Sequence, residues 1–196
     1  MKDRNQKALK EWASVVKALG EGKQVLLLRK GGIEEDHHQF QMEETEFFLF
    51  PTYEHQEKNL LKPEFQHLID QTETQADLWA GKVGLSYYAV IQEIFQVRET
   101  ESLRRLDPYH IWSEAMTQER LGWRPKEPLF VPLLRVYRLP STLLIDALER
   151  YGGCKSWIEF DRPIPTEKAT PVLWDTDFQL QQERIRQILS PSEKTI

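Results

Sequence analysis

The segment KVGLSYYAVIQEIFQV, residues 82–97, is the longest strand-like stretch of the chain and weighs most on its fold class. Its first half alternates apolar positions with the residues between them, and a period of two is typical of a β-strand. The alternating positions are Val83, Leu85, Tyr87 and Ala89. The second half also fits the period of a helix, so the pattern leaves that half open.

Other apolar runs extend the β-structure outward from this segment. PLFVPLLRVYRLP, residues 128–140, alternates from Leu134 onward, and its Pro132 is typical of a strand edge or a bulge. Shorter runs predict strands at residues 24–30, 46–50 and 155–160, the second of them ended by Pro51. The sequence therefore predicts about five strands.

Helical patterns lie between these runs. Ser113 suits the N-cap of a helix that ends at Gly122. An opening helix is indicated by apolar residues at helical spacing, which stop at two glycines. Its positions are Leu9, Trp12, Val16 and Leu19, followed by Gly20 and Gly22. Further helices are expected at residues 63–70, 102–106 and 141–151, a loop or the rim of a hairpin at residues 33–44, and a loop at residues 71–77.

The C-terminal part of the chain follows a proline-bearing segment, residues 161–171, which we interpret as a linker. Asp177 then caps a final helix. Its apolar side carries Phe178, Ile185, Ile188 and Leu189. We expect one domain over residues 1–160, and a linker with a C-terminal helix over residues 161–196. The sequence leaves open whether this helix docks on the domain or binds a partner protein.

The order of the elements indicates the fold class. Strands and helices are interspersed at irregular intervals, which favours an α+β fold over a regular βαβ winding. We expect a small sheet, mixed or partly closed like a β-barrel, with helices on its flanks. A length of 196 residues suits one domain with a short appendage.

The composition is that of a globular protein. Hydrophobic residues make up 40% and charged residues 29% of the chain, and its 6 Trp, 6 Tyr and 9 Phe residues argue against disorder. No apolar run approaches the ~20 residues that span a bilayer, and the charged start of the chain is unlike a signal peptide. We therefore expect a cytoplasmic protein that does not enter a membrane. The single Cys154 excludes internal disulfides.

The formal net charge of −5 predicts no general attraction to nucleic acid or to an anionic membrane. The charge is uneven along the sequence, however. One region holds many basic residues between acidic ones: Arg98, Arg104, Arg105, Arg120, Arg124, Lys126, Arg135 and Arg138. A local basic patch is compatible with this pattern, but the linear sequence does not define it.

Familiar catalytic and phosphate-binding motifs are absent from the sequence. There is no GxxxxGK, GxGxxG, HExxH, CxxC or GxSxG pattern. The stretch DHH, residues 36–38, carries metal-ligand types, but adjacent residues do not easily converge on one ion. The triplet EGK, residues 21–23, has the acid-x-Lys form of metal-dependent nucleases but precedes the first predicted strand. We therefore predict no metal site and no cofactor.

Arg29 and Lys30 form the first candidate for binding. They precede Gly31-Gly32, and cationic side chains beside free backbone N–H groups suit a phosphate. The simpler interpretation is an ordinary strand end followed by a tight turn.

Tyr53 and His55 form the second candidate, directly after a predicted strand, where loops often carry function. His55 could act as an acid or a base, with Glu54 or Glu57 orienting its ring. The same ring could instead only fix the loop by a hydrogen bond.

The third candidate is DPYHIWS, residues 107–113. Tyr109 and Trp112 could stack on a base, and His110 could bond its polar edge. The alternative is that these side chains cover the start of the following helix. Whether His55 and His110 face each other decides if the second and third candidates share a pocket.

Five stretches in order, LLLRKGGI, FLFPTYEHQ, HIWS, LLRVYRLP and YGGCKSW, resemble an uncharacterised bacterial family that is frequent in cyanobacteria. The family is named only as domain of unknown function one-eight-zero-two. The resemblance spans about residues 8–160. It implies a cytosolic bacterial protein and brings no activity, cofactor or catalytic residue with it.

A looser similarity concerns the order of elements. Gly22, Leu28 and Arg29, then YYAVIQEIFQV, a helical insert and LFVPLLRVYRL resemble the order found in PUA and ASCH modules. Those modules are small barrels that bind RNA or modified bases. The similarity lies in order and hydropathy, so it is an analogy of fold.

Three functions follow as hypotheses. The first is a module that binds RNA or a nucleotide without catalysis of its own. Its phosphate would meet Arg29 and Lys30, and its base an aromatic and polar pocket of Tyr53, His55, Tyr109, His110 and Trp112. The second is an adaptor that binds a protein through the C-terminal helix, which suits the acidic net charge better. The third is a hydrolase or nuclease that uses His55 or His110 with carboxylates.

Overall fold

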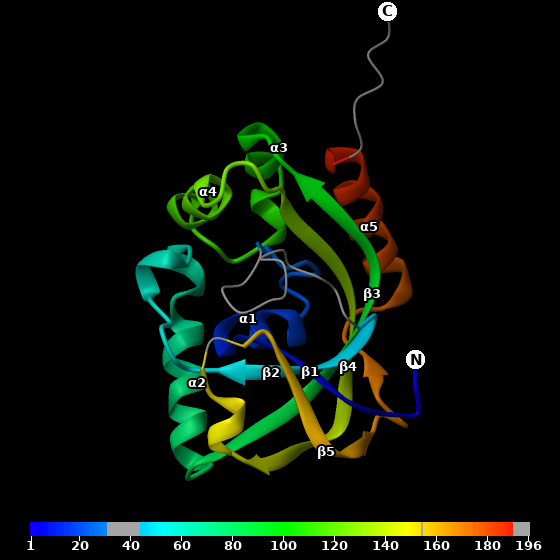
Figure 1. Cartoon of the computed structure of the whole chain (residues 1–196). Helices are drawn as coiled ribbons and strands as arrows, with labels where there is room; N and C mark the ends of the chain where they lie inside the picture. Colours follow the sequence, from blue (N-terminus) through cyan, green and yellow to red (C-terminus); the bar gives the residue numbers. More distant parts are fainter. Residues whose placement is uncertain (31–43, 154, 190–196) are drawn as a thin grey trace, which may run out of the picture.

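One six-stranded sheet organises the chain, in the order β5–β1–β2–β3–β4–β6 (Figure 1). The computed structural model describes residues 1–30, 44–153 and 155–189. β1 is parallel to β2, and the other neighbouring strands are antiparallel. The strands are β1 (Arg4–Trp12), β2 (Glu46–Thr52), β3 (Lys82–Val97), β4 (Leu129–Asp146), β5 (Trp157–Pro165) and β6 (Thr170–Pro171). The sheet is mixed and open, with helices on its flanks, which confirms the predicted α+β class.

β3 and β4 form the longest strand pair, and the segment at residues 82–97 is a strand throughout. The helical alternative for its second half is therefore excluded. Pro132 lies opposite Ile94, beside a shift in register. Its carbonyl accepts a hydrogen bond from the Leu27 N–H at 3.0 Å. The irregularity predicted at this proline is confirmed.

Five α-helices flank the sheet in the described part of the chain. They are α1 (Ala13–Gly20), α2 (His67–Leu78), α3 (Thr100–Arg105), α4 (Glu114–Gly122) and α5 (Asp175–Leu189). Gly20 ends α1 as predicted, and a Cβ at this position would lie 2.0 Å from the ring of Tyr87. Ser113 caps α4 as predicted, because its Oγ accepts a hydrogen bond from the Met116 N–H at 3.3 Å.

The opening segment differs from the sequence-based prediction. Residues 4–12 form β1, and the helix begins only at Ala13. β1 lies between β2 and β5, so Leu9 packs on one face of the sheet and Ala8 on the other. A strand buried on both faces lacks the alternating pattern. Its apolar residues continue into those of α1 at helical spacing, which explains the wrong prediction.

Two further segments were assigned to the wrong element. β4 continues through Ser141 to Asp146, where a helix was predicted, because these residues pair with the first residues of β3. α2 covers residues 71–77, which were predicted as a loop. The run at residues 24–30 is buried and extended, but it contributes isolated bridges to β4 rather than a full strand.

The C-terminal region packs on the sheet. β5 continues to Pro165, so the first residues of the predicted linker belong to a strand. α5 begins at Asp175, two residues before the expected cap. Its Phe178 and Ile185 are buried in the main core, as the predicted apolar side requires. The Arg135 guanidinium lies 4.8 Å from the centre of the Phe178 ring. The domain division at residue 160 stays a prediction.

Two apolar clusters cover the two faces of the sheet. The larger one joins the sheet to helices and includes Leu9 and Phe47. The smaller one lies on the other face and includes Phe48 and Tyr88. Consecutive phenylalanines on β2 thus point to opposite faces, as the pleat of a strand requires. Within the described residues, no helix is long and apolar enough to cross a membrane.

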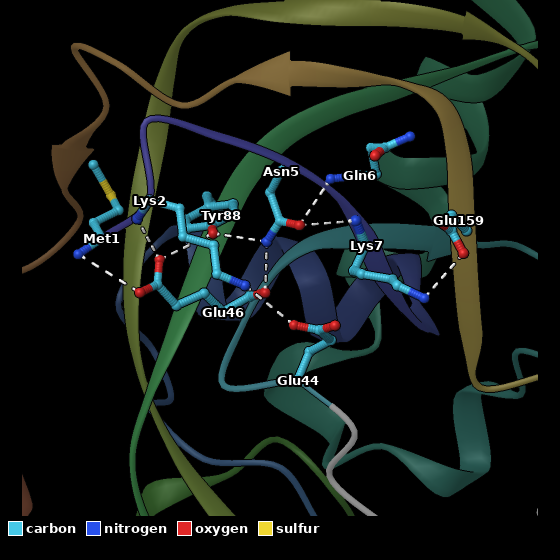
Figure 2. A network of polar contacts seen from close by, with 9 residues as sticks. All are labelled: Met1, Lys2, Asn5, Gln6, Lys7, Glu44, Glu46, Tyr88 and Glu159. Atoms are coloured by element: carbon cyan, nitrogen blue, oxygen red, sulfur yellow. Dashed lines mark hydrogen bonds and ion pairs between the residues drawn. The ribbon is translucent and has the colours of Figure 1, made fainter.

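A polar network joins the first residues of the sheet (Figure 2). Asn5 Nδ2 donates to the Glu46 carbonyl at 2.7 Å and to the Tyr88 hydroxyl at 2.9 Å. The Tyr88 hydroxyl donates to Glu46 Oε2 at 3.1 Å, and the Lys2 N–H donates to the same atom at 2.6 Å. Burial raises the pKa of Tyr88, so its hydroxyl keeps the proton that it donates. These bonds fix the start of β1 against β2 and β3.

Candidate functional site

The ends of the two parallel strands bring three segments together. β1 and β2 end at the same edge of the sheet, where Trp12 lies opposite Thr52. α1 begins directly after β1, and the turn at residues 53–56 leaves from the end of β2. Gln56 Oε1 accepts a hydrogen bond from the Ser14 N–H at 2.9 Å, which holds this turn against the start of α1.

A group of charged and aromatic side chains gathers at this edge, and we call it the strand-end cluster. It consists of Glu11, Trp12, Arg29, Trp112 and Arg120. The residues come from β1, from the segment after α1 and from the two ends of the α4 region. Their positions in the sequence are far apart, so the fold alone brings them together.

Glu11 is the centre of the charges in the cluster. Its Oε1 accepts the Trp12 N–H at 2.9 Å, and its Oε2 lies 3.2 Å from Arg29 Nη1. The Glu11 and Arg29 side chains are only 9% and 13% exposed, so this ion pair is largely shielded from water. Shielded pairs are screened by salt much less than surface pairs.

The guanidinium group of Arg120 lies close enough to Glu11 to interact with its carboxylate. It is partly buried, and burial lowers its pKa, as does the charge of Arg29, while Glu11 opposes the shift. Arg120 forms no ion pair with any other residue that the structure describes. The carboxylate of Glu11 therefore acts on both Arg29 and Arg120, and Glu119 is a second carboxylate that acts on Arg120. The cluster thus holds charges of both signs in a setting with little water.

Two tryptophans form the aromatic part of the cluster. The ring centres of Trp12 and Trp112 lie 5.0 Å apart, with 60° between the ring planes. Trp112 is buried and Trp12 is partly exposed. Trp112 also bridges to Leu61. Trp12 is therefore a partly accessible ring that a buried ring supports from behind.

His110 lies in the core and not on a surface. It is 2% exposed, and neither ring nitrogen has a hydrogen-bond partner among the described residues. Burial and the charge of Lys62 lower its pKa to about 4, against smaller opposing effects of Asp107 and the Trp112 backbone. Lys62 Nζ donates to the His110 carbonyl at 2.7 Å and lies 3.2 Å from Asp107 Oδ1. At neutral pH the imidazole is therefore uncharged.

The other predicted residues lie in different surroundings. Tyr53 is half-buried, which raises its pKa to about 12. His55 is exposed and has a left-handed backbone with a φ of 62°. Tyr109 is partly buried against the main core. Because His55 is exposed and His110 is buried, the two histidines do not present their rings to one solvent-filled space.

Arg29 and Lys30 point to different partners. Arg29 pairs with Glu11, and its N–H donates to the Phe130 carbonyl at 2.8 Å. Lys30 is buried, and its Nζ donates to the Leu121 carbonyl at 2.5 Å. Gly31-Gly32 and the DHH stretch at residues 36–38 lie outside the described residues. Among the residues that are described, no group of three or more His, Cys, Asp or Glu side chains could hold a metal ion.

The cluster includes residues that the sequence did not indicate. Arg29 and Trp112 were candidates, but Trp12 was assigned to the apolar side of an opening helix, and Glu11 to the same helix. Arg120 was one of many basic residues in its region. The sequence would have placed Glu11 and Trp12 at the sheet edge only if residues 4–12 had been predicted to form a strand parallel to β2.

The chain is an α+β domain in which charged and tryptophan side chains gather at one edge of the sheet. The chain belongs to the family described as domain of unknown function (DUF1802), whose model matches residues 8–184. The family resemblance is thus confirmed. The match continues beyond the expected residue 160 and into α5.

Two solved structures are similar to the chain. One is a mutant of the ASCH protein of Zymomonas mobilis, with 14% identity and a TM-score of 0.46 over 83% of this chain and 92% of that chain. The other is the ASCH protein of Zymomonas mobilis, with 14% identity and a TM-score of 0.44 over 90% of this chain and 94% of that chain. No curated protein matches the chain significantly.

Proposed function

We propose that this chain binds single-stranded nucleic acid or a nucleotide through the strand-end cluster. The observation that supports the proposal is the pair of guanidinium groups, Arg29 and Arg120, around the carboxylate of Glu11. Removing guanidinium groups from water is costly, and an anion bound at the cluster would offset part of that cost. A phosphate suits the site because guanidinium groups bind its oxygens with charge-assisted hydrogen bonds.

The two tryptophans of the cluster narrow the class of ligand that suits the site. Trp12 follows Glu11 in β1 and offers a partly exposed ring, and Trp112 supports that ring at 5.0 Å. A base stacked on an aromatic side chain contributes about 1–3 kcal/mol, largely without regard to sequence. A ligand with both a phosphate and a flat ring would use both parts of the cluster. Nucleotides and single strands have this combination.

The net charge of the chain does not favour its encounter with a nucleic acid. A chain with a net charge of −5 repels nucleic acid at long range, so no attraction of the whole surface helps the encounter. Binding then depends on the guanidinium groups of the strand-end cluster. We expect modest affinity that falls with salt, and no binding to the general surface.

A direct titration tests the proposal. A fluorescein-labelled single-stranded RNA is titrated with the full chain in buffer of low ionic strength, and its polarisation is measured. Saturable binding that weakens as salt is added supports the proposal. No rise in polarisation up to the highest protein concentration would reject it.

A further inference from the structure

Four apolar side chains lie at the surface where α2 ends and β3 begins, and we call them the apolar patch. They are Leu78, Trp79, Leu144 and Leu148. Leu78 is 79% exposed, Leu144 48% and Leu148 40%, while Trp79 is partly buried. Figure 1 shows this end of the molecule, where the last turn of α2 leads into the first residues of β3. None of the four residues belongs to the strand-end cluster.

Strand pairing places two of these side chains together. The ring of Trp79 lies so close to the backbone of Gly84 that it leaves no room there for a Cβ. Gly84 on β3 pairs with Leu144 on β4, and paired residues of antiparallel strands point to the same face of a sheet. Trp79 and Leu144 are therefore neighbours on this face.

The backbone brings the other two leucines to the same end of the sheet. Gly81 lies three residues after Leu78, and its φ of 82° suits the turn from α2 into β3. The Gly81 carbonyl accepts a hydrogen bond from the Ala147 N–H at 3.3 Å, one residue before Leu148. The end of α2 and the end of β4 thus form one surface.

The fold gains little from an exposed leucine at this surface. Hydrophobic stability comes from apolar area that folding removes from water, and Leu78 remains mostly exposed. Contiguous exposed apolar side chains with polar residues around them are typical of interaction sites, whereas single ones are common on any protein. The patch therefore has the character of a contact surface.

The helix beside the patch is acidic. α2 carries Asp70, Glu73 and Asp77, and it contains no Lys or Arg. All three carboxylates are exposed, and their spacing of three and four residues places them along one side of the helix. Asp70 pairs with Lys58 at 2.6 Å. Neither Glu73 nor Asp77 forms an ion pair with another described residue, so both carboxylates are open to a partner.

The β4 side of the patch has no unpaired cation to balance this charge within the described residues. Lys82 pairs with Asp146 at 3.0 Å, and Arg150 pairs with Asp161. Glu149 directly follows the patch in sequence and is exposed. It forms no ion pair in the part of the chain that the structure describes. The surroundings of the patch are therefore acidic on both sides.

We propose that the apolar patch binds a basic amphipathic helix of another protein. Such a helix presents apolar residues on one side with charges beside them, and it docks by placing its apolar side on an apolar surface. Its leucines would cover Leu78 and Leu144, and its Lys or Arg side chains would meet Glu73 and Asp77. The opposite charges would speed the encounter and select a basic partner.

The charges disfavour three other occupants. Nucleic acid and anionic lipid are negatively charged, so the unpaired carboxylates around the patch would repel them. A second copy of this chain, related by a two-fold axis, would bring the same patch against itself and place acidic residues opposite acidic residues. A basic partner avoids both problems.

The test uses a fluorescein-labelled helical peptide of leucine and lysine, with its leucines along one side. Polarisation should show saturable binding to the wild-type chain. Leu78→Gln and Leu144→Gln should each weaken binding about tenfold, because each removes an apolar contact at the centre of the surface. Glu73→Gln should weaken it about threefold and reduce its salt dependence. Leu78→Gln should keep the wild-type Tm, so loss of binding by this variant is not loss of fold.

Two substitutions on α5 are the matched controls. Leu180→Gln changes a leucine that is also exposed, and Glu183→Gln removes an exposed carboxylate. Both variants should bind the peptide like wild type. No saturable binding to wild type, or equal losses in Leu78→Gln and Leu180→Gln, would overturn the proposal. Equally tight binding of a peptide with glutamate in place of lysine would also overturn it.

Two further measurements examine the other occupants. Sedimentation detects self-association, and flotation detects binding to vesicles that contain an anionic phospholipid. A wild-type dimer that Leu78→Gln dissociates would assign the patch to a second copy and overturn the proposal. Vesicle binding that Leu78→Gln abolishes would assign the patch to a membrane, with the same consequence. We expect a monomer that does not float with the vesicles.

Discussion

The Oε2 atom of Glu11 lies 3.2 Å from Nη1 of Arg29, while Oε1 of the same carboxylate accepts the Trp12 N–H. One side chain therefore joins the end of β1 to the segment that holds Arg29. Because Arg120 also interacts with Glu11, this carboxylate acts on both guanidinium groups of the strand-end cluster. A change at Glu11 should act on stability and on binding in opposite directions.

Glu11→Gln should lower the free energy of unfolding by about 2 kcal/mol, because two guanidinium groups lose a partly buried partner. The same variant should bind single-stranded RNA more tightly at low salt, because the cluster gains one positive charge. Urea denaturation and polarisation titrations measure the two effects. Glu159→Gln is the control, since its carboxylate is 61% exposed and pairs with Lys7 at the surface. It should change stability by less than about 0.5 kcal/mol. Weaker RNA binding by Glu11→Gln would contradict the role of the cluster.

Trp12→Ala should weaken RNA binding by about 1–3 kcal/mol, because it removes the partly exposed ring on which a base would stack. Trp174→Ala is the matched control, because Trp174 is 82% exposed and lies outside the cluster. Circular dichroism first checks that both variants are folded, and polarisation then compares their affinities. Equal losses in the two variants would mean that Trp12 has no special part in binding.

His110 should make the fold sensitive to acid. Its pKa is lowered to about 4 in the folded chain, against a usual value of 6.5. Between these values the unfolded chain binds a proton that the folded chain excludes, so stability falls as pH falls from 6.5 towards 4. The loss should reach about 1.4 kcal/mol per pH unit within that window. Above pH 6.5 this contribution no longer changes.

Two histidine variants check this dependence by urea denaturation at several pH values. His110→Phe should lose the part of the acid sensitivity that belongs to His110. It should be at least as stable as wild type at pH 7, because neither ring nitrogen has a partner among the described residues. His67→Gln, at an exposed position of α2, should keep the wild-type dependence. An unchanged pH profile in His110→Phe would show that the imidazole is not buried in neutral form.

α5 should be required for the stability of the sheet. Phe178→Ala should lower the free energy of unfolding by about 3–4 kcal/mol, because the ring is 5% exposed and packs in the main core. Leu180→Ala, on the same helix, should cost less than about 0.5 kcal/mol, because Leu180 is 52% exposed. Chemical denaturation measures both. A small effect of Phe178→Ala would favour a helix that is free to bind a partner.

Short sequence patterns correctly predicted the elements that neighbouring residues specify. The alternation in β3, the cap of α4 at Ser113 and the apolar side of α5 are visible in short windows of sequence, and the structure has all three. β1 could not be assigned in this way, because its burial on both faces comes from β2 and β5. The extension of β4 to Asp146 likewise depends on pairing with β3, which is distant in sequence.

The candidate site likewise combines residues that short motifs indicated with residues that they did not. Arg29 and Trp112 were recognisable as residue types that bind phosphate and bases, each within its own short motif. Their neighbours Glu11 and Arg120 come from distant segments, so only the order of the strands brings the four together. His110 seemed equivalent to Trp112 in sequence, but its ring is enclosed in the core. Burial of this kind depends on tertiary packing.

The most direct test of the strand-end cluster compares two arginine variants in RNA binding over a range of salt concentrations. Arg120→Gln removes the guanidinium that shares Glu11 with Arg29, and Arg150→Gln removes an exposed one that pairs with Asp161. We predict that Arg120→Gln weakens binding about tenfold and reduces the slope of log K against log salt by about one, while Arg150→Gln binds like wild type. Equal affinities and equal salt slopes for the two variants would contradict the proposed site.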